Sequence, residues 1–245
     1  MADHLSQKII KIYREHDNFI KKQKSKKDLV DSFPLFIKRE QLTYYLIKYE
    51  LLKKVLNIKG SIVECGVYKG SSLMLMSKIL SIFEPYGIHR KIIGFDTFTG
   101  FPKSSIVDQK NQKNKKRYKK NYLGDTSLSN IKQSIKLFNK NRPNGHINKI
   151  ELIKGDALKT IPNYLKSNSH LVISLLYLDF DLFEPTKIAL KYFLPRMPKG
   201  SIIAFDQINQ KRWQGETVAL LKSLNLNKFK LEQFSAEPSI SYIQI

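Results

Sequence analysis

The chain has 245 residues, 42% of them hydrophobic, which suffices for the core of one large or two small domains. It lacks an apolar signal core, and no run approaches the roughly 18 apolar residues of a membrane span. A single cysteine excludes a disulfide scaffold, and together these features predict a cytoplasmic protein without a membrane span. The net charge of +22 invites a nucleic-acid interpretation, but seven of the 43 basic residues are arginine, so lysines scattered over a solvated surface explain it better.

The first part of the chain has the apolar spacing of helices. Apolar residues recur at helical intervals over residues 9–13 and again over residues 42–56. A lysine-rich stretch, residues 21–27, separates the two segments, and Phe-Pro at 33–34 breaks the chain before the second. We therefore expect residues 1–57 to form an N-terminal helical cap.

Residues 58–245 alternate short apolar strands with helices, which predicts an α/β domain with a mostly parallel sheet covered on both faces. The last two strands are joined by residues 235–239, too few for a crossover helix, so they must form an antiparallel hairpin. Seven strands ending in such a hairpin are typical of the Rossmann-like, class I S-adenosylmethionine-dependent methyltransferase fold. Strands are predicted at 61–65, 91–95, 150–153, 171–178, 201–205, 229–234 and 240–245, and helices at 71–83, 127–140, 161–166, 186–194 and 215–224.

One segment after the second strand breaks this rhythm. Residues 108–122 contain almost no apolar side chain, and residues 110–120 carry seven positive charges. The composition predicts a mobile loop insert at the carboxyl edge of the sheet. We expect this loop and the helical cap to close over an anionic acceptor; a solvated insert without a role is the alternative.

The turn after the first strand has the features of a nucleotide-type site. The strand ends at Glu64-Cys65-Gly66, and Gly70 completes the turn before two serines at the start of a helix. Glycine permits a sharp turn and close approach to a ligand, and serine can satisfy free N–H groups at a helix start. The single cysteine is expected to be a small core residue rather than a nucleophile.

Acidic residues also follow the second and third strands. Asp96 is placed to accept hydrogen bonds from a ribose diol, or else to cap the next turn. Asp156 can meet an adenine amino group or equally cap the following helix. We assign to the cofactor site Glu64, Cys65, Gly66, Gly70, Ser71, Ser72, Asp96, Thr97, Phe98, Gly155, Asp156 and Ala157.

The fourth and fifth strands end in carboxylates that would face one crevice. Asp179 and Asp206, with the amide oxygen of Gln207, form a set of hard oxygen ligands suited to Mg²⁺. A metal there can lower the pKa of a hydroxyl and prepare it to attack a methyl group. The alternative is that one aspartate caps a turn. Asp181 would point away from Asp179 if the strand continued.

Four segments carry a family resemblance: residues 62–72, 94–102, 154–162 and 178–187 (LDFDLFEPTK), the last being the most specific. They resemble the macrocin O-methyltransferase family (TylF/MycF type), over about residues 38–224. The resemblance implies methylation of a sugar hydroxyl with S-adenosylmethionine and a divalent metal. It implies that Asp179 and Asp206 hold the metal and that Asp179 is the candidate base. The family usually has two adjacent aspartates where this chain has Asp206 and Gln207, which bears on metal affinity.

The resemblance leaves the acceptor open among nucleotide-linked sugars, glycans and glycosylated natural products. A nicotinamide dehydrogenase is disfavoured because Gly66 and Gly70 do not fit Gly-x-Gly-x-x-Gly. The alternative function is a nucleic-acid-binding protein or RNA methyltransferase that uses the positive charge, although acids at the strand ends would repel phosphate. A sugar-containing, anionic small molecule is thus the favoured partner, nucleic acid is disfavoured, and a homo-oligomer is left open.

Overall fold

The computed structural model describes residues 7–110 and 118–245. The chain divides into two compact units, Met1–Leu46 and Ile47–Ile245. The division predicted from the sequence, a cap over 1–57 and a main domain over 58–245, stays a prediction. Among the described residues no helix is both long and apolar enough to cross a membrane.

The first unit is helical, as its apolar spacing predicts. It contains α1 (Gln7–Lys21), α2 (Lys26–Asp31), α3 (Phe33–Phe36) and the first half of α4 (Arg39–Val55). The rings of Phe19 and Phe36 stack with centroids 5.5 Å apart. Pro34 stands in the first turn of α3, where a missing N–H costs no hydrogen bond, so the expected break at 33–34 is the start of a short helix.

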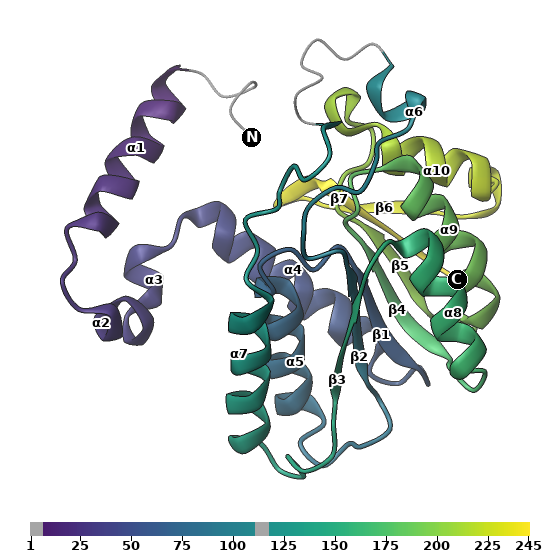
Figure 1. Ribbon diagram of the computed structural model, residues 1–245, viewed down its shortest axis with the longest axis horizontal. Coiled ribbons are helices and arrows are strands. Elements are labelled where there is room, and N and C mark those ends of the chain that lie inside the picture. Colours follow the sequence, from purple (N-terminus) through teal and green to yellow (C-terminus); the bar gives the residue numbers. More distant parts are fainter. Residues whose placement is uncertain (1–6, 111–117) are drawn as a thin grey trace. The chain divides into compact units, whose positions relative to one another are not determined.

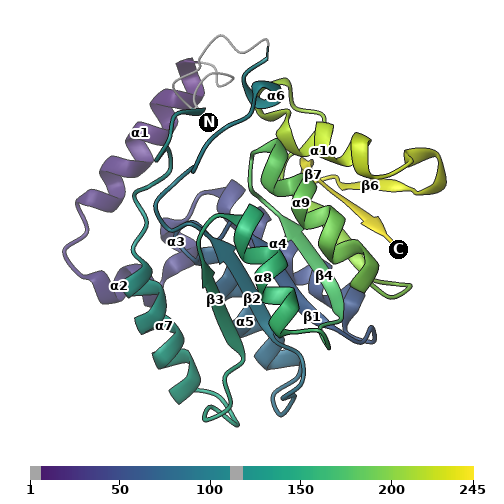
Figure 2. The same cartoon turned by 45° about the vertical axis from the view of Figure 1, so that its right-hand side comes forward.

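The second unit is built on one seven-stranded sheet with the order β3-β2-β1-β4-β5-β7-β6 (Figure 1). β1 to β5 are parallel, and β7 runs antiparallel to both β5 and β6. Figure 2 shows the β6–β7 hairpin, in yellow, at the opposite side of the sheet from β3. The predicted fold class and its C-terminal hairpin are confirmed. The strands are β1 (Ser61–Cys65), β2 (Ile92–Asp96), β3 (Ile150–Lys154), β4 (Ile173–Leu178), β5 (Ile202–Phe205), β6 (Leu231–Phe234) and β7 (Glu237–Gln244).

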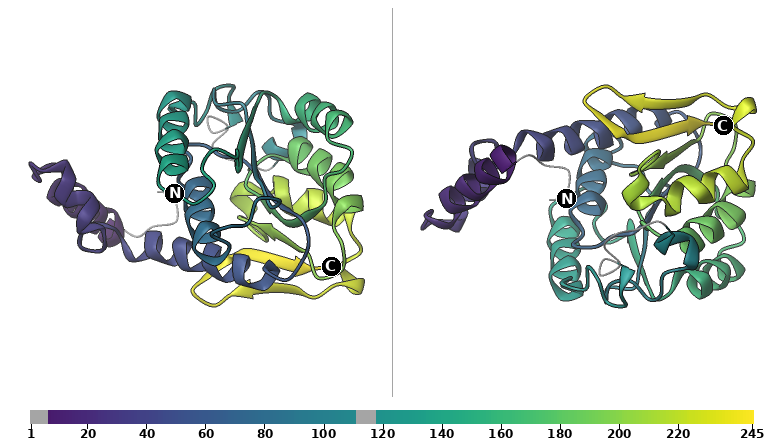
Figure 3. Two further views of the ribbon diagram at one scale, coloured as in Figure 1. Left: turned by 90° about the horizontal axis from the view of Figure 1, so that it is seen from below. Right: turned by 90° about the horizontal axis from the view of Figure 1, so that it is seen from above.

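Helices cover both faces of the sheet (Figure 3). On one face, α8, α9 and α10 bury apolar side chains against Val63, Phe95 and Leu176. Because side chains alternate along a strand, Glu64 and Tyr177 point to the opposite face from Val63 and Leu176. On that face lie α5, α7 and the second half of α4. The helices of this unit after α4 are α5 (Ser71–Phe83), α6 (Ile106–Gln109), α7 (Leu128–Lys140), α8 (Ala157–Ser167), α9 (Phe183–Phe193) and α10 (Gly215–Ser223), with short 3₁₀ turns η3 (Leu194–Arg196), η4 (Lys211–Trp213) and η5 (Leu226–Lys228).

Two helices begin earlier than the sequence predicts. α8 begins at Ala157 instead of residue 161, because the Asp156 carboxylate accepts a hydrogen bond from the Leu158 N–H at 3.0 Å and caps the helix. α9 begins at Phe183 instead of residue 186, which places Pro185 in its first turn.

The predicted loop insert, residues 108–122, is anchored at both of its described ends. Asp108 is fully buried in α6, and its carboxylate accepts a hydrogen bond from the Phe183 N–H at 2.7 Å. Tyr118 is buried against Trp213, with ring centroids 5.3 Å apart. These ends are packed, unlike the mobile loop predicted from composition, and the rest of that prediction falls on residues 111–117, outside the described residues.

Candidate functional site

A cavity of about 130 Å³ lies where the turns after β1 to β4 meet. Its lining includes Gly66, Asp96, Gly155 and Asp179, one residue from each of these turns. A larger hollow of about 420 Å³ lies near Arg90, at the amino ends of the strands. Open α/β sheets bind ligands at the carboxyl ends of their strands, so we place the candidate site at the smaller cavity.

Gly66 brings the turn after β1 against the turn after β4. Its φ is +97°, and a Cβ at this position would lie 1.9 Å from the backbone oxygen of Asp179. The Asp179 N–H in turn donates to the Cys65 carbonyl at 2.8 Å. Only glycine fits between these backbones, so the turn after β1 packs directly on Asp179, and the predicted close approach of a ligand to Gly66 stays a prediction.

The helix start after this turn differs from the expected serine cap. Gly70, in the left-handed region with φ of +81°, caps α5 and no side chain contributes a capping hydrogen bond. Ser71 and Ser72 are the first two residues of α5. They are therefore placed near the turn, but the prediction that a serine satisfies the free N–H groups is wrong.

Asp96 holds the turns around the cavity together. Its Oδ2 accepts hydrogen bonds from the N–H groups of Val67 and Tyr68, both at 2.8 Å, and its Oδ1 accepts one from Phe98 at 2.6 Å. A carboxylate has about four acceptor positions, so one remains on Oδ1. The expected pair of ribose hydrogen bonds therefore has to share Asp96 with the protein backbone.

The remaining predicted cofactor residues lie beside Asp96. The Thr97 hydroxyl donates to the Gly100 carbonyl at 2.6 Å, and Phe98 is buried with a φ of +53°. Gly155 donates its N–H to the Asp96 carbonyl at 2.9 Å. Asp156 caps α8, which is the alternative considered for it, and it also lines the cavity together with Ala157.

Glu64 and Cys65 end β1 on opposite faces. Both are fully buried. Neither carboxylate oxygen of Glu64 has a hydrogen-bond partner of ordinary geometry in the described part of the chain. Burial raises the pKa of Glu64 to about 7, while the Lys48 ammonium and the Ser72 hydroxyl oppose the rise. Cys65 packs in the core, where burial raises the pKa of its thiol, so it contributes its backbone carbonyl and not a nucleophile.

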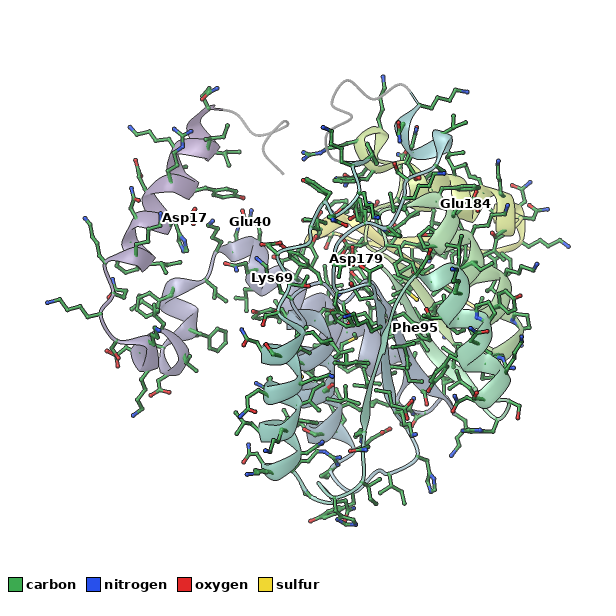
Figure 4. All side chains as sticks on the ribbon, in the orientation of Figure 1. Asp17, Glu40, Lys69, Phe95, Asp179 and Glu184 are labelled. Carbon is green, nitrogen blue, oxygen red and sulfur yellow. The ribbon has the colours of Figure 1, made fainter. Side chains whose placement is uncertain are left out.

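The predicted metal ligands lie on neighbouring strand ends. Asp179 follows β4 and is half-buried, and Asp206 follows β5 and is buried. The Tyr177 hydroxyl donates to Asp206 Oδ1 at 2.6 Å. Burial, and then the charges of Asp206 and Asp181, raise the pKa of Asp179 well above its usual range. Figure 4 shows Asp179 nearer the loops and Phe95, on β2, in the interior.

Asp181 belongs to the same cluster. β4 ends at Leu178, and Asp181 has a φ of +61°, so strand alternation does not extend to it. Burial, followed by the charge of Asp206, raises the pKa of Asp181 to about 7, and the residue lines the cavity together with Asp179. The expectation that Asp181 points away applied only to a continuing strand, and that condition is not met because β4 ends at Leu178.

Glu216 is a site residue that sequence reasoning missed. It is fully buried in the first turn of α10. Its Oε1 accepts a hydrogen bond from the Asp181 N–H at 3.2 Å, and its Oε2 accepts one from the Gln207 N–H at 3.1 Å. One carboxylate thus ties the turn after β4 to the turn after β5. No local sequence signal marks this contact, because its partners are 35 and 9 residues away.

Lys48 on α4 was also missed. Its side chain is 2% exposed, and its Nζ lies 2.9 Å from the centroid of the Tyr177 ring. The pKa of Lys48 is lowered overall, because burial lowers it and the carboxylates of Asp206, Glu64, Asp179 and Glu216 oppose this only in part. A signal existed in the sequence: Lys48 occupies the first position of an i, i+3, i+4, i+7 stripe with buried Leu51, Leu52 and Val55.

The chemistry of the donors fits a hard divalent cation. Among the described residues, no group of three or more His, Cys, Asp or Glu is arranged to hold a metal ion. A three-ligand set therefore needs Gln207, whose Oε1 is buried and has no hydrogen-bond partner among those residues. Two carboxylates and an amide oxygen are ligands that Mg²⁺ accepts.

The chain is similar to known O-methyltransferases. The model of the family described as macrocin-O-methyltransferase (TylF) matches residues 48–226. The crystal structure of CalS11, a calicheamicin methyltransferase, has 32% identity and a TM-score of 0.90, over 98% of this chain and 94% of that chain. Apo CalS11, described as a TDP-rhamnose 3′-O-methyltransferase in calicheamicin biosynthesis, has 30% identity and a TM-score of 0.83, over 98% and 96%.

A more distant structure supports the fold alone. The O-methyltransferase NovP has 18% identity and a TM-score of 0.65, over 82% of this chain and 78% of that chain. No curated protein sequence matches the chain. The resemblance read from the sequence motifs is confirmed by the family match and by the two CalS11 structures.

Proposed function

Because this chain belongs to the macrocin-O-methyltransferase (TylF) family, we propose that it transfers the methyl group of S-adenosylmethionine to a hydroxyl of a sugar-containing small molecule. The observation that carries the proposal is the cavity where four strand-to-helix turns meet beside Asp179. Asp179 is partly exposed, whereas Asp181, Asp206 and Glu216 are buried. It is therefore the carboxylate of this cluster best placed to meet an acceptor.

The methyl donor is proposed to bind along the turns after β1, β2 and β3. Gly66 lines the cavity there, and Asp96 offers its remaining Oδ1 acceptor position to a ribose hydroxyl. Asp156 and Ala157 line the same cavity and are placed for the adenine ring. The surrounding carboxylates favour the positively charged sulfonium of the donor.

In the transfer step, the acceptor hydroxyl oxygen forms a bond to the methyl carbon while the carbon–sulfur bond breaks, leaving S-adenosylhomocysteine. Asp179 accepts the hydroxyl proton as the general base. Tyr177 holds Asp206 through its 2.6 Å hydrogen bond, and Glu216 holds the turns that carry Asp181 and Gln207. Asp179, Asp206 and Gln207 would hold a divalent cation, which when bound lowers the pKa of the acceptor hydroxyl.

For the acceptor we propose a nucleotide-linked sugar. The support is the similarity to CalS11, which is described as a TDP-rhamnose 3′-O-methyltransferase. An anionic acceptor also agrees with the net charge of +22. The predicted closure of residues 110–120 over such an acceptor stays a prediction. A nucleic-acid acceptor is less favoured, because neither the matching family nor the CalS11 structures are described as acting on nucleic acid.

Calorimetry with S-adenosylhomocysteine tests the donor site. Asp96→Asn should weaken binding by about ten- to a hundredfold, because a charge-assisted acceptor is lost and the turns it holds loosen. A thermal melt of the same variant establishes that it is folded. If the parent binds S-adenosylhomocysteine and the variant binds it with the same affinity, Asp96 is not part of the donor site.

Mass spectrometry then tests the acceptor. The protein is incubated with S-adenosylmethionine, Mg²⁺ and either TDP-rhamnose or the free sugar. A mass increase of one methyl group on the nucleotide-linked sugar, absent with Asp179→Asn, supports the proposal. Failure to methylate either compound, by a protein that binds S-adenosylhomocysteine, would contradict TDP-rhamnose as the acceptor and leave the donor site standing.

A further inference from the structure

Lys48 is a cation buried inside the second unit. The second half of its helix, α4, lies along one face of the sheet (Figure 3), and Lys48 contacts Tyr177 on that face. Its Nζ lies 2.9 Å from the centroid of the Tyr177 ring, and the side chain is 2% exposed. A cation at the face of an aromatic ring is attracted to it, and burial strengthens the attraction.

The aromatic ring connects this cation to the proposed metal site. Tyr177 lies on β4 and is fully buried, and its hydroxyl donates to Asp206 Oδ1 at 2.6 Å. One face of the ring therefore carries the Lys48 ammonium, while the hydroxyl at its edge holds a carboxylate that we assign to the metal. The two opposite charges are separated by a single side chain.

Four carboxylates lie close enough to act on Lys48. Asp206, Glu64, Asp179 and Glu216 all act on it electrostatically. The other lysine buried in the described part of the chain, Lys149, donates to the Gly87 carbonyl at 2.9 Å, beside the amino end of β2. Lys48 is thus the buried lysine, in that part of the chain, that faces the acidic cluster.

We propose that Lys48 is a resident cation of the site, which neutralises part of the acidic cluster through Asp206 and so limits how tightly the cluster binds a divalent metal. This inference rests on the metal site of the proposed function. Two positive charges at short range repel each other, and screening by water is weak in a buried cluster. Removal of the ammonium should therefore increase metal affinity.

Manganese titration tests this inference directly, with Mn²⁺ as the probe and its paramagnetic resonance signal as the readout. Lys48→Met keeps the length of the side chain and removes the charge, and it should bind Mn²⁺ about tenfold more tightly than the parent. Lys53→Met is the matched control, because Lys53 lies on the same helix with about half of its side chain exposed. The control should leave the affinity within about twofold, since exposed charges are screened.

A gain in affinity cannot arise from unfolding, so it separates the proposed role from a structural one. The effect of Lys48→Met is measured again in an Asp206→Asn background, against Asp206→Asn alone, and there it should fall to within about twofold. A tenfold gain that persists in that background would overturn the route through Asp206. Unchanged or weaker Mn²⁺ binding in Lys48→Met would overturn the proposal, and Lys48→Gln replaces that variant if its thermal melt shows misfolding. S-adenosylhomocysteine binding is measured alongside: its absence in the parent contradicts the proposed function, whereas the Mn²⁺ comparison still decides the role of Lys48.

Discussion

The backbone of Gly66 lies against the backbone carbonyl of Asp179, so that a Cβ at position 66 would stand 1.9 Å from the carbonyl oxygen. The turn proposed to contact the methyl donor and the residue proposed as the base are therefore in direct backbone contact. The Asp179 N–H adds a 2.8 Å hydrogen bond to the Cys65 carbonyl. Any change that separates these turns should disturb donor binding and the base together.

Gly66→Ala should remove S-adenosylhomocysteine binding and lower the free energy of unfolding by at least about 2 kcal/mol, because the new Cβ overlaps a backbone atom and φ is +97°. Calorimetry and chemical denaturation measure the two effects. Gly87→Ala is the control, since a Cβ there would lie 3.1 Å from its nearest neighbour, the Glu84 Cβ, instead of overlapping a backbone atom. Parent-like binding by Gly66→Ala would contradict the close packing of the two turns.

Glu216→Gln should destabilise the protein by about 1–3 kcal/mol, because an amide NH₂ would face one of the two N–H groups that the carboxylate now accepts. It should also lower turnover, since the turns carrying Asp181 and Gln207 lose their shared anchor. Glu184→Gln is the matched control, because Glu184 is exposed in the first turn of α9. Equal stability of the two variants in urea denaturation would show that the bridge contributes nothing.

Gln207→Asp should bind Mg²⁺ about tenfold more tightly than the parent, because it adds a charge beside Asp179 and Asp206. In the parent, excess EDTA should stop methyl transfer while S-adenosylhomocysteine binding remains. Calorimetry gives the Mg²⁺ affinity, and mass spectrometry of the methylated sugar gives the turnover. Full turnover in EDTA would mean that Asp179 acts as a base without metal assistance.

Glu64→Gln should reduce the pH dependence of stability between about pH 5 and pH 8. Burial raises the pKa of Glu64 from 4.5 to about 7, so the folded protein binds a proton that the unfolded chain has released. The contribution of Glu64 to stability is therefore largest below pH 4.5 and falls, by about 1.4 kcal/mol per pH unit, as the pH rises towards the folded pKa.

Thermal melts of the parent and of Glu64→Gln across this range check the prediction. The difference between the two proteins isolates Glu64, because Asp181 also has a raised pKa and titrates in both of them. The stability of Glu64→Gln minus that of the parent should be larger at pH 8 than at pH 5. Parallel curves would show that Glu64 titrates at its ordinary pKa.

Local pattern decided the elements of the sheet domain. Apolar runs and helical spacing predicted α5 at residues 71–83, where the structure has Ser71–Phe83, and a short connection after residue 234 predicted the antiparallel hairpin. The motifs around Glu64, Asp96 and Asp179 also predicted the family, which the family match confirms. These signals are local, because strand and helix periodicity and turn chemistry depend on neighbouring residues.

The tertiary structure decided which residues act together. Lys48 is 129 positions from Tyr177 in the numbering, and it reaches that ring because α4 packs on the sheet. Glu216 bridges two turns, Asp96 is shared with the backbone of the turn after β1, and Asp181 turns into the cluster once β4 has ended. Such contacts depend on the register of the parallel strands and on helix packing, which join distant segments and leave no periodic trace in the sequence.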